Sequence, residues 1–439
     1  MKKIKCVFKK NKVLLCFFFL ILLFRNAFGL DLSQAIDLAL ENDPEFLVAK
    51  QTILANREKL AQGQAPLLPK ISGTIGNIQN YPTTGESSNI TSYGISINQV
   101  IFNYELNASQ KQSVLSVKEA ESNFQSSKQN IFLKITSAFF NVLIAQNDLK
   151  TVVAEKKAVF EQLEFAKRNF EVGTSTITDQ QEAQARFDLI RATEIKSRND
   201  LAVQRTNLEK MLLSPLPKII NGIDNSINVV KPKITDPKEW MKLARDKNFD
   251  IIAAKARLEF AKIELKKSKK YHMPSISATA SVNRTDSNTL SVNNGSQTLS
   301  LNLSIPFYEG GLYKSELRET IANFNKAQHS LDLALLNADR KAAKSYRNFI
   351  AGLAQVEALE AAEKSSKVAL ESNRLGYEVG VRINIDVLNS QKQLFSSQRD
   401  LSKARYDALS ALLELKASIG QLNRDEIILV SNLIKNSSN

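Results

Sequence analysis

The feature that most constrains the fold is an internal repeat, because the chain of 439 residues contains the same unit twice. Pro69-Lys70-Ile71-Ser72 returns as Pro274-Ser275-Ile276-Ser277, an offset of 205 residues (274 − 69). Phe170-Glu171-Val172-Gly173 returns as Tyr377-Glu378-Val379-Gly380, an offset of 207 (380 − 173). Since the parts keep their order and nearly their spacing, the sequence predicts two structural repeats, residues 30–235 and 236–439.

The first 29 residues have the pattern of a secretory signal peptide. Six lysines between Lys2 and Lys12 precede an apolar run from Val13 to Phe24. A retained N-terminal helix is the alternative. Removing residues 1–29 takes away six Lys and one Arg, so the formal net charge falls from +14 to +7 (14 − 7), which gives no indication of nucleic-acid binding. Both cysteines leave as well, so we expect no disulfide and no thiolate ligand in the mature chain.

Two segments in each repeat alternate between apolar and small polar residues, as β-strands do. They are residues 71–78, 93–101, 275–282 and 299–305. We expect hairpins over 71–102 and 275–306, with Ser-, Thr-, Asn- and Gly-rich loops at 82–90 and 284–296. Such alternation is typical of a membrane barrel with a wet lumen. A soluble antiparallel sheet alternates in the same way, so this pattern alone does not separate the two.

A long helical segment follows each hairpin. Residues 104–171 contain no Pro or Gly, and apolar positions recur there at heptad spacing, as they do in residues 311–378. A helix of that length reaches roughly 100 Å at about 1.5 Å per residue. Shorter helices are expected at residues 32–62, 178–213, 236–268 and 386–419. The connector 214–235 and the C-terminal tail are expected to form a belt around the middle. An ordinary extended coiled coil is the alternative.

Four strands cannot close a barrel by themselves. Membrane barrels begin at about eight strands, and lipid does not tolerate an open sheet edge. No segment after the signal peptide approaches the roughly 20 apolar residues of a membrane helix. A chain that spans the membrane with these strands must therefore associate. Two copies give eight strands and three give twelve, and only the larger barrel leaves a passage.

The residues of the second repeat resemble a known family. Residues 377–388, Tyr-Glu-Val-Gly-Val-Arg-Ile-Asn-Ile-Asp-Val-Leu, followed by Ala404-Arg405-Tyr406, are similar to the second hairpin tip and returning helix of the TolC family. Phe170-Glu171-Val172-Gly173 with Thr178-Asp179 resembles the first tip, and residues 32–40 resemble the mature N-terminus. The resemblance covers essentially the whole mature chain, in order and in both repeats.

The resemblance implies an α+β membrane protein in the outer membrane that extends into the periplasm. The expected assembly is a homotrimer with a 12-stranded transmembrane β-barrel, four strands per chain, continuous with a long periplasmic α-helical barrel of coiled-coil hairpins. Its expected function is a passive exit duct of tripartite efflux pumps or type I secretion, opened at its periplasmic tip. The expected partners are a periplasmic adaptor protein, an inner-membrane transporter and outer-membrane lipid. The cargo does not follow from the sequence.

The resemblance also implies an aperture gate. By position, Asp386 matches a carboxylate that rings the closed periplasmic aperture in family members. Tyr377 and Arg382 match residues whose contacts with the neighbouring coil hold the aperture shut, and Thr178 and Asp179 occupy the partner positions. Asn389 stands where the best-known members place a second acidic ring, which implies weaker cation binding here.

The gate has a physical rationale and a plain alternative. Three Asp386 side chains near one axis would concentrate cations and repel anions. An Arg382–Asp179 contact would lock one hairpin against the next. The alternative is that both aspartates simply begin helices, where the helix dipole favours them. Gly173 and Gly380 are expected to end the long helices, with adaptor docking at the tip as a further role.

No catalytic motif is visible, so we expect no enzyme and no cofactor. His272 and His329 are far apart in the sequence and the mature chain has no Cys, which argues against a metal site. The competing interpretation of the whole chain is a periplasmic structural coiled-coil protein with a soluble β-sheet. An exported hydrolase is a third class, and no group of residues supports it.

Overall fold

The structure is a computed structural model in which residues 30–217, 220, 222, 232, 234–287 and 294–436 are described. The expected signal peptide at 1–29, most of the connector 214–235 and the turn at 288–293 lie outside the described residues.

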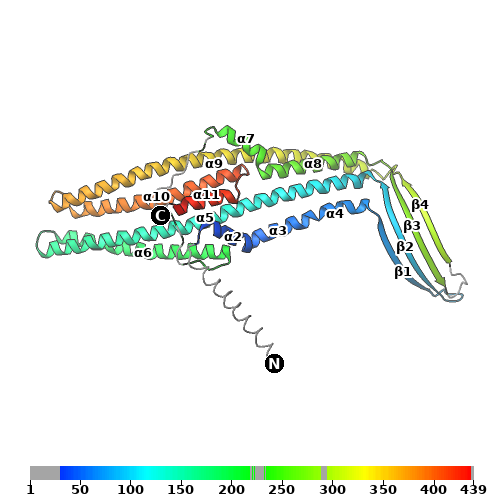
Figure 1. The fold of residues 1–439 in the computed structure, drawn as a ribbon, viewed down its shortest axis with the longest axis horizontal. Helices are drawn as coiled ribbons and strands as arrows, with labels where there is room; N and C mark the ends of the chain where they lie inside the picture. Colours follow the sequence, from blue (N-terminus) through cyan, green and yellow to red (C-terminus); the bar gives the residue numbers. More distant parts are fainter. Residues whose placement is uncertain are drawn as a thin grey trace, which may run out of the picture. The chain divides into compact units, whose positions relative to one another are not determined.

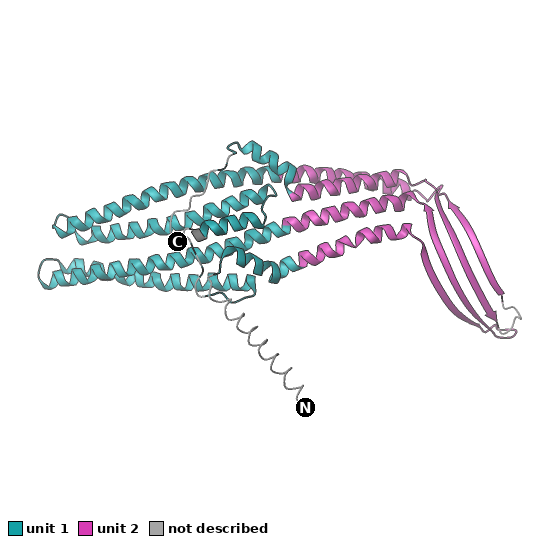
Figure 2. Ribbon diagram, in the orientation of Figure 1, with its two compact units in different colours: residues 1–47, 127–248, 338–439 teal, residues 48–126, 249–337 magenta. Residues whose placement is uncertain are grey.

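The chain forms two compact units, shown in different colours in Figure 2. Unit 1 comprises residues 1–47, 127–248 and 338–439, and unit 2 comprises residues 48–126 and 249–337. Each unit therefore takes segments from both halves of the sequence.

Unit 2 contains one four-stranded antiparallel sheet in the order β1-β2-β3-β4 (Figure 1). The strands are β1 (Lys70–Asn80), β2 (Ser88–Phe102), β3 (Ser275–Ser287) and β4 (Asn294–Ser304). All four expected strands are thus confirmed. They are longer than expected, because β2 and β3 extend into the segments that the sequence assigned to loops. Among the described residues, β1 and β4 each pair with one neighbour only.

The two faces of this sheet differ in chemistry. The register aligns Ile71, Ile97, Ala280 and Leu299 in one row across all four strands. The next row, on the opposite face, consists of Ser72, Ser96, Ser281 and Thr298. Since side chains alternate along a strand, one face is apolar and the other carries small polar groups. The apolar side chains are largely exposed in the chain, Leu299 by 83%.

The helical segments that connect directly to the strands belong to unit 2 as well. They are α3 (Pro44–Arg57, of which residues 48–57 are in unit 2), α4 (Lys59–Gln64), α8 (Phe249–Lys269) and the first parts of α5 (Tyr104–Glu171) and α9 (Leu312–Glu378). Three alanines of α8, Ala253, Ala254 and Ala256, are buried and allow close helix packing. Gln112 of α5 donates to Glu264 of α8 at 2.7 Å.

The prediction of one continuous helix in each of the segments 32–62 and 236–268 is wrong, because each segment is interrupted. The first is divided into α2 (Leu32–Asn42), α3 and α4, and the second into α7 (Pro237–Lys247) and α8. The first break falls at Asp43, whose carboxylate accepts from Phe46 N at 3.0 Å and caps α3 just before Pro44. The second falls at the repeat-equivalent Asn248 (43 + 205), whose amide donates to Ser418 O at 2.9 Å. A short polar side chain that satisfies backbone groups ends a helix at both places.

Unit 1 contains two long helical hairpins. The first joins α5 to α6 (Ile177–Leu212) and the second joins α9 to α10 (Asn384–Ser418), and all four helices lie within two residues of their expected bounds. Phe132, Phe139 and Phe140 of α5 are buried, and the Phe140 ring lies 5.4 Å from that of Tyr406 in α10. The Phe140 ring of α5 therefore packs against a second helix, α10.

The C-terminal tail is not merely a connecting segment, which corrects the expectation. It forms α11 (Arg424–Asn436), which packs on α2 and α10 through the buried side chains of Ile427, Val430 and Ile434. Arg424 pairs with Asp37 of α2. The i, i+3, i+7 spacing of the three apolar residues is that of an amphipathic helix. Within the part of the chain that the structure describes, no helix is both long and apolar enough to cross a membrane.

Candidate functional site

The two hairpins of unit 1 turn at equivalent glycines. Gly173 and Gly380 both have φ of 78°, a left-handed conformation that favours glycine. Thr174 N donates to Asn169 O at 2.8 Å, and Val381 N donates to Gly376 O at 2.8 Å, which closes the last turn of each long helix. Both glycines therefore end their helices in the way expected from the sequence.

The first tip closes with a capping box at the start of α6. Asp179 N donates to Thr176 Oγ1 at 3.2 Å, and the Asp179 carboxylate accepts from Thr176 N at 3.0 Å. The hydroxyls of Thr176 and Ser175 donate to the same carboxylate at 2.7 and 3.0 Å. Burial acts to raise the pKa of Asp179, but these hydrogen bonds outweigh it and lower the pKa overall. Asp179 is thus held as a charged helix cap.

The second tip lacks this arrangement. Ile383 occupies the N-cap position of α10 and offers no side-chain hydrogen bond. Asp386 carries the carboxylate of the first turn, and its nearest basic group is Arg382 Nη1, 3.7 Å from its Oδ2. Arg382 remains more than half exposed. Within one chain, Arg382 therefore pairs with Asp386, and its expected contact with Asp179 stays a prediction about two neighbouring chains.

The two tips are joined through a residue that the sequence interpretation missed as a site. Asn384, the first residue of α10, is fully buried. Its amide donates to Asp179 O at 3.1 Å, and its carbonyl oxygen accepts from Gln162 of α5 at 2.6 Å. Its repeat equivalent is Ile177 (384 − 207), so the change from an apolar to an amide side chain was the available signal.

Apolar contacts surround this hydrogen-bonded bridge. Leu388 of α10 is buried in a cluster with residues of the first hairpin, Val152, Val159, Leu163, Ala166, Ala183 and Ile190. The Tyr377 ring packs edge-on against Phe165 at 5.8 Å between centroids. Of the other predicted site residues, Thr178 and Asn389 are exposed. The structure therefore brings Tyr377, Asp179 and the start of α10 to the same pair of tips.

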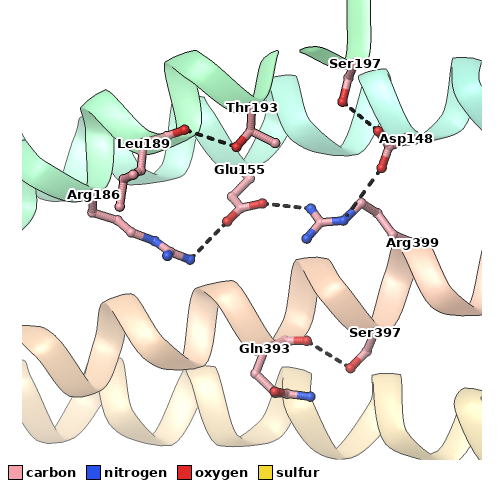
Figure 3. Close-up of polar contacts among 9 residues, drawn as sticks. All are labelled: Asp148, Glu155, Arg186, Leu189, Thr193, Ser197, Gln393, Ser397 and Arg399. Atoms are coloured by element: carbon pink, nitrogen blue, oxygen red, sulfur yellow. Dashed lines mark hydrogen bonds and ion pairs between the residues drawn. The ribbon is translucent and has the colours of Figure 1, made fainter. Parts of the chain in front are cut away.

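A buried ion cluster lies further along the same helices (Figure 3). Glu155 of α5 has a side chain only 3% exposed, and it accepts from Arg399 of α10 at 2.8 Å and from Arg186 of α6 at 3.3 Å. Arg399 also lies 3.7 Å from Asp148, which accepts from Ser197 at 2.6 Å. A buried carboxylate needs such partners, and removing one typically costs about 3–5 kcal/mol. The cluster holds α10 against the first hairpin about 24 Å from the tip, at about 1.5 Å per residue.

A second ion cluster is centred on Lys156, the residue that follows Glu155. Lys156 Nζ lies 2.6 Å from Glu194 of α6, and Arg198 pairs with the same carboxylate at 2.6 Å. The hydrogen bonds from Lys156 and Arg198 lower the pKa of Glu194. In both clusters the partners lie on different helices, so the sequence alone could not assign them.

The fold is that of outer-membrane channels. The solved structure titled as the open state of the MtrE outer membrane channel of Neisseria gonorrhoeae matches with a TM-score of 0.78 at 18% identity, over 90% of each chain. At this identity the likeness establishes the mainly helical fold with a four-stranded sheet.

The sequence identifies the family. A model of the outer membrane efflux protein family matches residues 35–212 and 240–421, so the chain belongs to that family. The alkaline protease secretion protein AprF of Pseudomonas aeruginosa is 28% identical over 428 residues, covering 94% of this chain and 89% of the relative. The outer membrane protein TolC of Vibrio cholerae is 28% identical over 413 residues, covering 92% and 94%. The resemblance to the TolC family is thereby confirmed, as is the location in the outer membrane, and the family consists of channel proteins.

Proposed function

We propose that three copies of this chain assemble into the outer-membrane exit duct of an efflux or type I secretion system. Service as an exit duct follows from the family. The trimer, the closed barrel and the partners are our proposal. The observation that carries it is the sheet, which has one apolar face, one face of small polar groups and two edges that can accept further strands.

The sheet supports a barrel because an apolar face suits lipid and a small polar face suits a wet lumen. Four strands from each of three chains give twelve, and pairing β4 of one chain with β1 of the next closes every edge. Twelve strands exceed the eight or so that fill with their own side chains. The competing periplasmic coiled coil would leave Ile71, Ile75 and Leu299, exposed by 69%, 82% and 83%, in water.

The tips support a gate. Asp386 follows a turn at which Arg382 is its nearest cation, and three such carboxylates near one axis would form a cation-attracting ring. Arg382 and Tyr377 would hold each tip to its neighbours, with Thr178 and Asp179 as the opposite surface and Asn389 as a neutral position beside the ring. The exposed turns at Gly173 and Gly380 would receive a periplasmic adaptor protein, which links the duct to an inner-membrane transporter.

The proposed organisation divides the chain into a signal peptide at 1–29 and two repeats at 30–235 and 236–439. The equivalent helix breaks at Asp43 and Asn248 and the equivalent turns at Gly173 and Gly380 support this division.

The assembly is tested by electron microscopy of the detergent-purified mature protein. We expect a tapered cylinder on the order of 100 Å or more in length, from the helix rise, with threefold symmetry in end views. Thin rods, or small particles with no threefold view, would refute the trimeric duct.

A further inference from the structure

The junction between sheet and helices in unit 2 contains a cavity of about 560 Å³. Among its lining residues are Ser275 at the start of β3 and Ser304 at the end of β4, which pair with each other in the sheet. Both belong to the face that carries small polar groups. The cavity therefore lies on the polar side of the sheet.

The helices are acidic on this polar side. The carboxylates that line the cavity are Glu105, Glu264, Glu309, Glu316 and Glu319. Two lysines, Lys267 and Lys270, also line the cavity. Lys267 pairs with Glu264 at 2.9 Å and lies 3.6 Å from Glu105, and Lys270 Nζ lies 4.6 Å from the centroid of the Tyr104 ring. Negative side chains thus outnumber the positive ones on the side that would face the lumen.

The opposite side of α8 is basic. A helix turns by about 100° per residue, so Lys269 points about 200° away from the cavity-lining Lys267. Lys262 is seven residues before Lys269 and shares its face, and Lys266 lies between them. All three lysines are exposed, and Lys262 pairs with Glu259 at 3.1 Å.

The neighbouring helix α9 repeats this division. Leu312, Glu316 and Glu319 of α9 line the cavity. Lys314 follows Leu312 by two residues and Arg318 follows Glu316 by two residues, which is about 200° around the helix. Both basic residues therefore point away from the cavity, and both are exposed. We call Lys262, Lys266, Lys269, Lys314 and Arg318 the basic collar. Since the cavity lies on the polar side of the sheet, the basic collar faces the opposite side, on the parts of α8 and α9 next to the strands in the sequence.

Two aromatic residues mark the boundary between the apolar face and the collar. Phe307 and Tyr308, between β4 and α9, are exposed by 83% and 84%. Phe307 follows Leu303 and Ile305 at two-residue intervals in the sequence, just past the end of β4 at Ser304. Exposed aromatic rings next to an apolar band are typical of the level of lipid headgroups.

We propose that the basic collar binds the phosphate groups of anionic phospholipids in the leaflet that faces the periplasm. This inference rests on the proposed membrane-spanning duct. Lys266 and Lys269 lie in the last turn of α8, the helix that precedes β3. Lys262 is about 10 Å from Lys269 along α8 at about 1.5 Å per residue, which is about one Debye length. Basic residues at this depth attract anionic headgroups.

The test compares lipids retained by the full mature protein after reconstitution in a phosphatidylcholine–phosphatidylglycerol mixture and extraction, measured by native mass spectrometry. The collar variant carries Lys266→Gln, Lys269→Gln, Lys314→Gln and Arg318→Gln. Its matched control carries Lys157→Gln, Lys196→Gln, Lys364→Gln and Lys367→Gln, which removes four exposed charges far along the long helices. We expect the wild type and the control to retain phosphatidylglycerol several-fold over phosphatidylcholine, and the collar variant to show no preference.

Three outcomes overturn the inference. Equal retention of the two lipids by the wild type, or a preference that survives in the collar variant, shows that the collar binds no anionic lipid. Displacement of the lipid by inorganic phosphate at matched concentration shows a phosphate site that does not need a membrane. Bilayer conductance separates the failure of the collar from the failure of the duct. Normal conductance with no lipid preference refutes the collar alone. Failure of the wild type and both variants to enter bilayers refutes the duct and the collar together.

Discussion

The two hairpin tips of unit 1 share a glycine at the turn and an aspartate six residues later, but they use the aspartate differently. Asp179 and Asp386 are repeat equivalents (386 − 179 = 207), and so are Ser175 and Arg382 (382 − 175 = 207). In the first tip the carboxylate accepts three hydrogen bonds and closes a capping box. In the second tip the helix has no side-chain cap, and Asp386 has an arginine at 3.7 Å.

In our proposal, this difference separates a structural role from a functional role after the duplication. A carboxylate that satisfies the backbone of its own helix is committed to local stability. A carboxylate in the same position that caps no backbone group can change its contacts, for example to bind a passing ion. The first tip is therefore the fixed partner in our proposal, and the second is the one that changes its contacts when the duct opens.

The largest expected effect comes from giving the second tip the residue of the first. Arg382→Ser places the equivalent of Ser175 beside Asp386 and removes the cation that we assign to the lock between chains. We expect single-channel conductance in planar bilayers to rise several-fold. Arg374→Ser, which removes another exposed arginine of the same hairpin that pairs with Glu378, is the control and should conduct like the wild type. Unchanged conductance in Arg382→Ser would refute the lock.

A second test separates the two aspartates by ion selectivity. Asp386→Asn removes the proposed ring charge, so the preference for cations over anions should fall, because a ring of charge sets the local concentration of ions. Asp179→Asn should leave selectivity intact, since that carboxylate is occupied by its helix cap. Reversal potentials in asymmetric salt measure both variants. An equal loss of selectivity in both would remove the distinction between the tips.

A smaller effect is expected where the two tips meet. Asn384→Ile restores the residue of the first repeat, Ile177, and leaves the amide of Gln162 and the carbonyl of Asp179 without their partner. Unsatisfied buried polar groups cost about 1–3 kcal/mol each. Hydrogen exchange at the first turn of α10 should quicken accordingly, with Asn389→Ile, an exposed position of the same helix, as the control. Unaltered exchange would show that the bridge adds no stability.

The smallest effect concerns pH. The pKa of Asp179 is lowered in the folded chain, so its contribution to stability is present above the ordinary Asp range and is lost as pH falls through the lowered value. Hydrogen exchange at the start of α6 should therefore become faster only in acid below that ordinary range. Thr176→Ala removes hydrogen bonds to the carboxylate and should shift this transition to higher pH. A transition that does not move would assign it to another group.

Much of the fold was predictable because its signals are local. Heptad spacing of apolar residues predicted the two long helices, and alternation predicted the four strands. The interruptions at Asp43 and Asn248 were missed because a helix break that depends on one side chain, such as Asn248 donating to Ser418 O, involves a residue 170 positions away. The helix in the C-terminal tail was missed because its apolar stripe consists of only three buried residues, Ile427, Val430 and Ile434, and depends on packing against α2 and α10.

The residues of the candidate site also fall into those that the sequence identified and those that it did not. The tip residues were found through the repeat and the family resemblance, which are properties of sequence. Asn384 and the Glu155–Arg186–Arg399 cluster were not found, because their importance comes from groups on other helices that only folding brings within hydrogen-bond distance.

The sequence by itself therefore determined the duplicated order of strands and helices, the family, and the glycines at which the hairpins turn, since periodicity and backbone conformation are written into neighbouring residues. The tertiary structure decided which of two equivalent aspartates became a helix cap and which did not. It also decided which charged side chains were buried together and on which side of the sheet the basic faces of α8 and α9 lie. These outcomes depend on contacts between distant segments, because the energy of a charge is set by the partners and the burial that the whole fold provides.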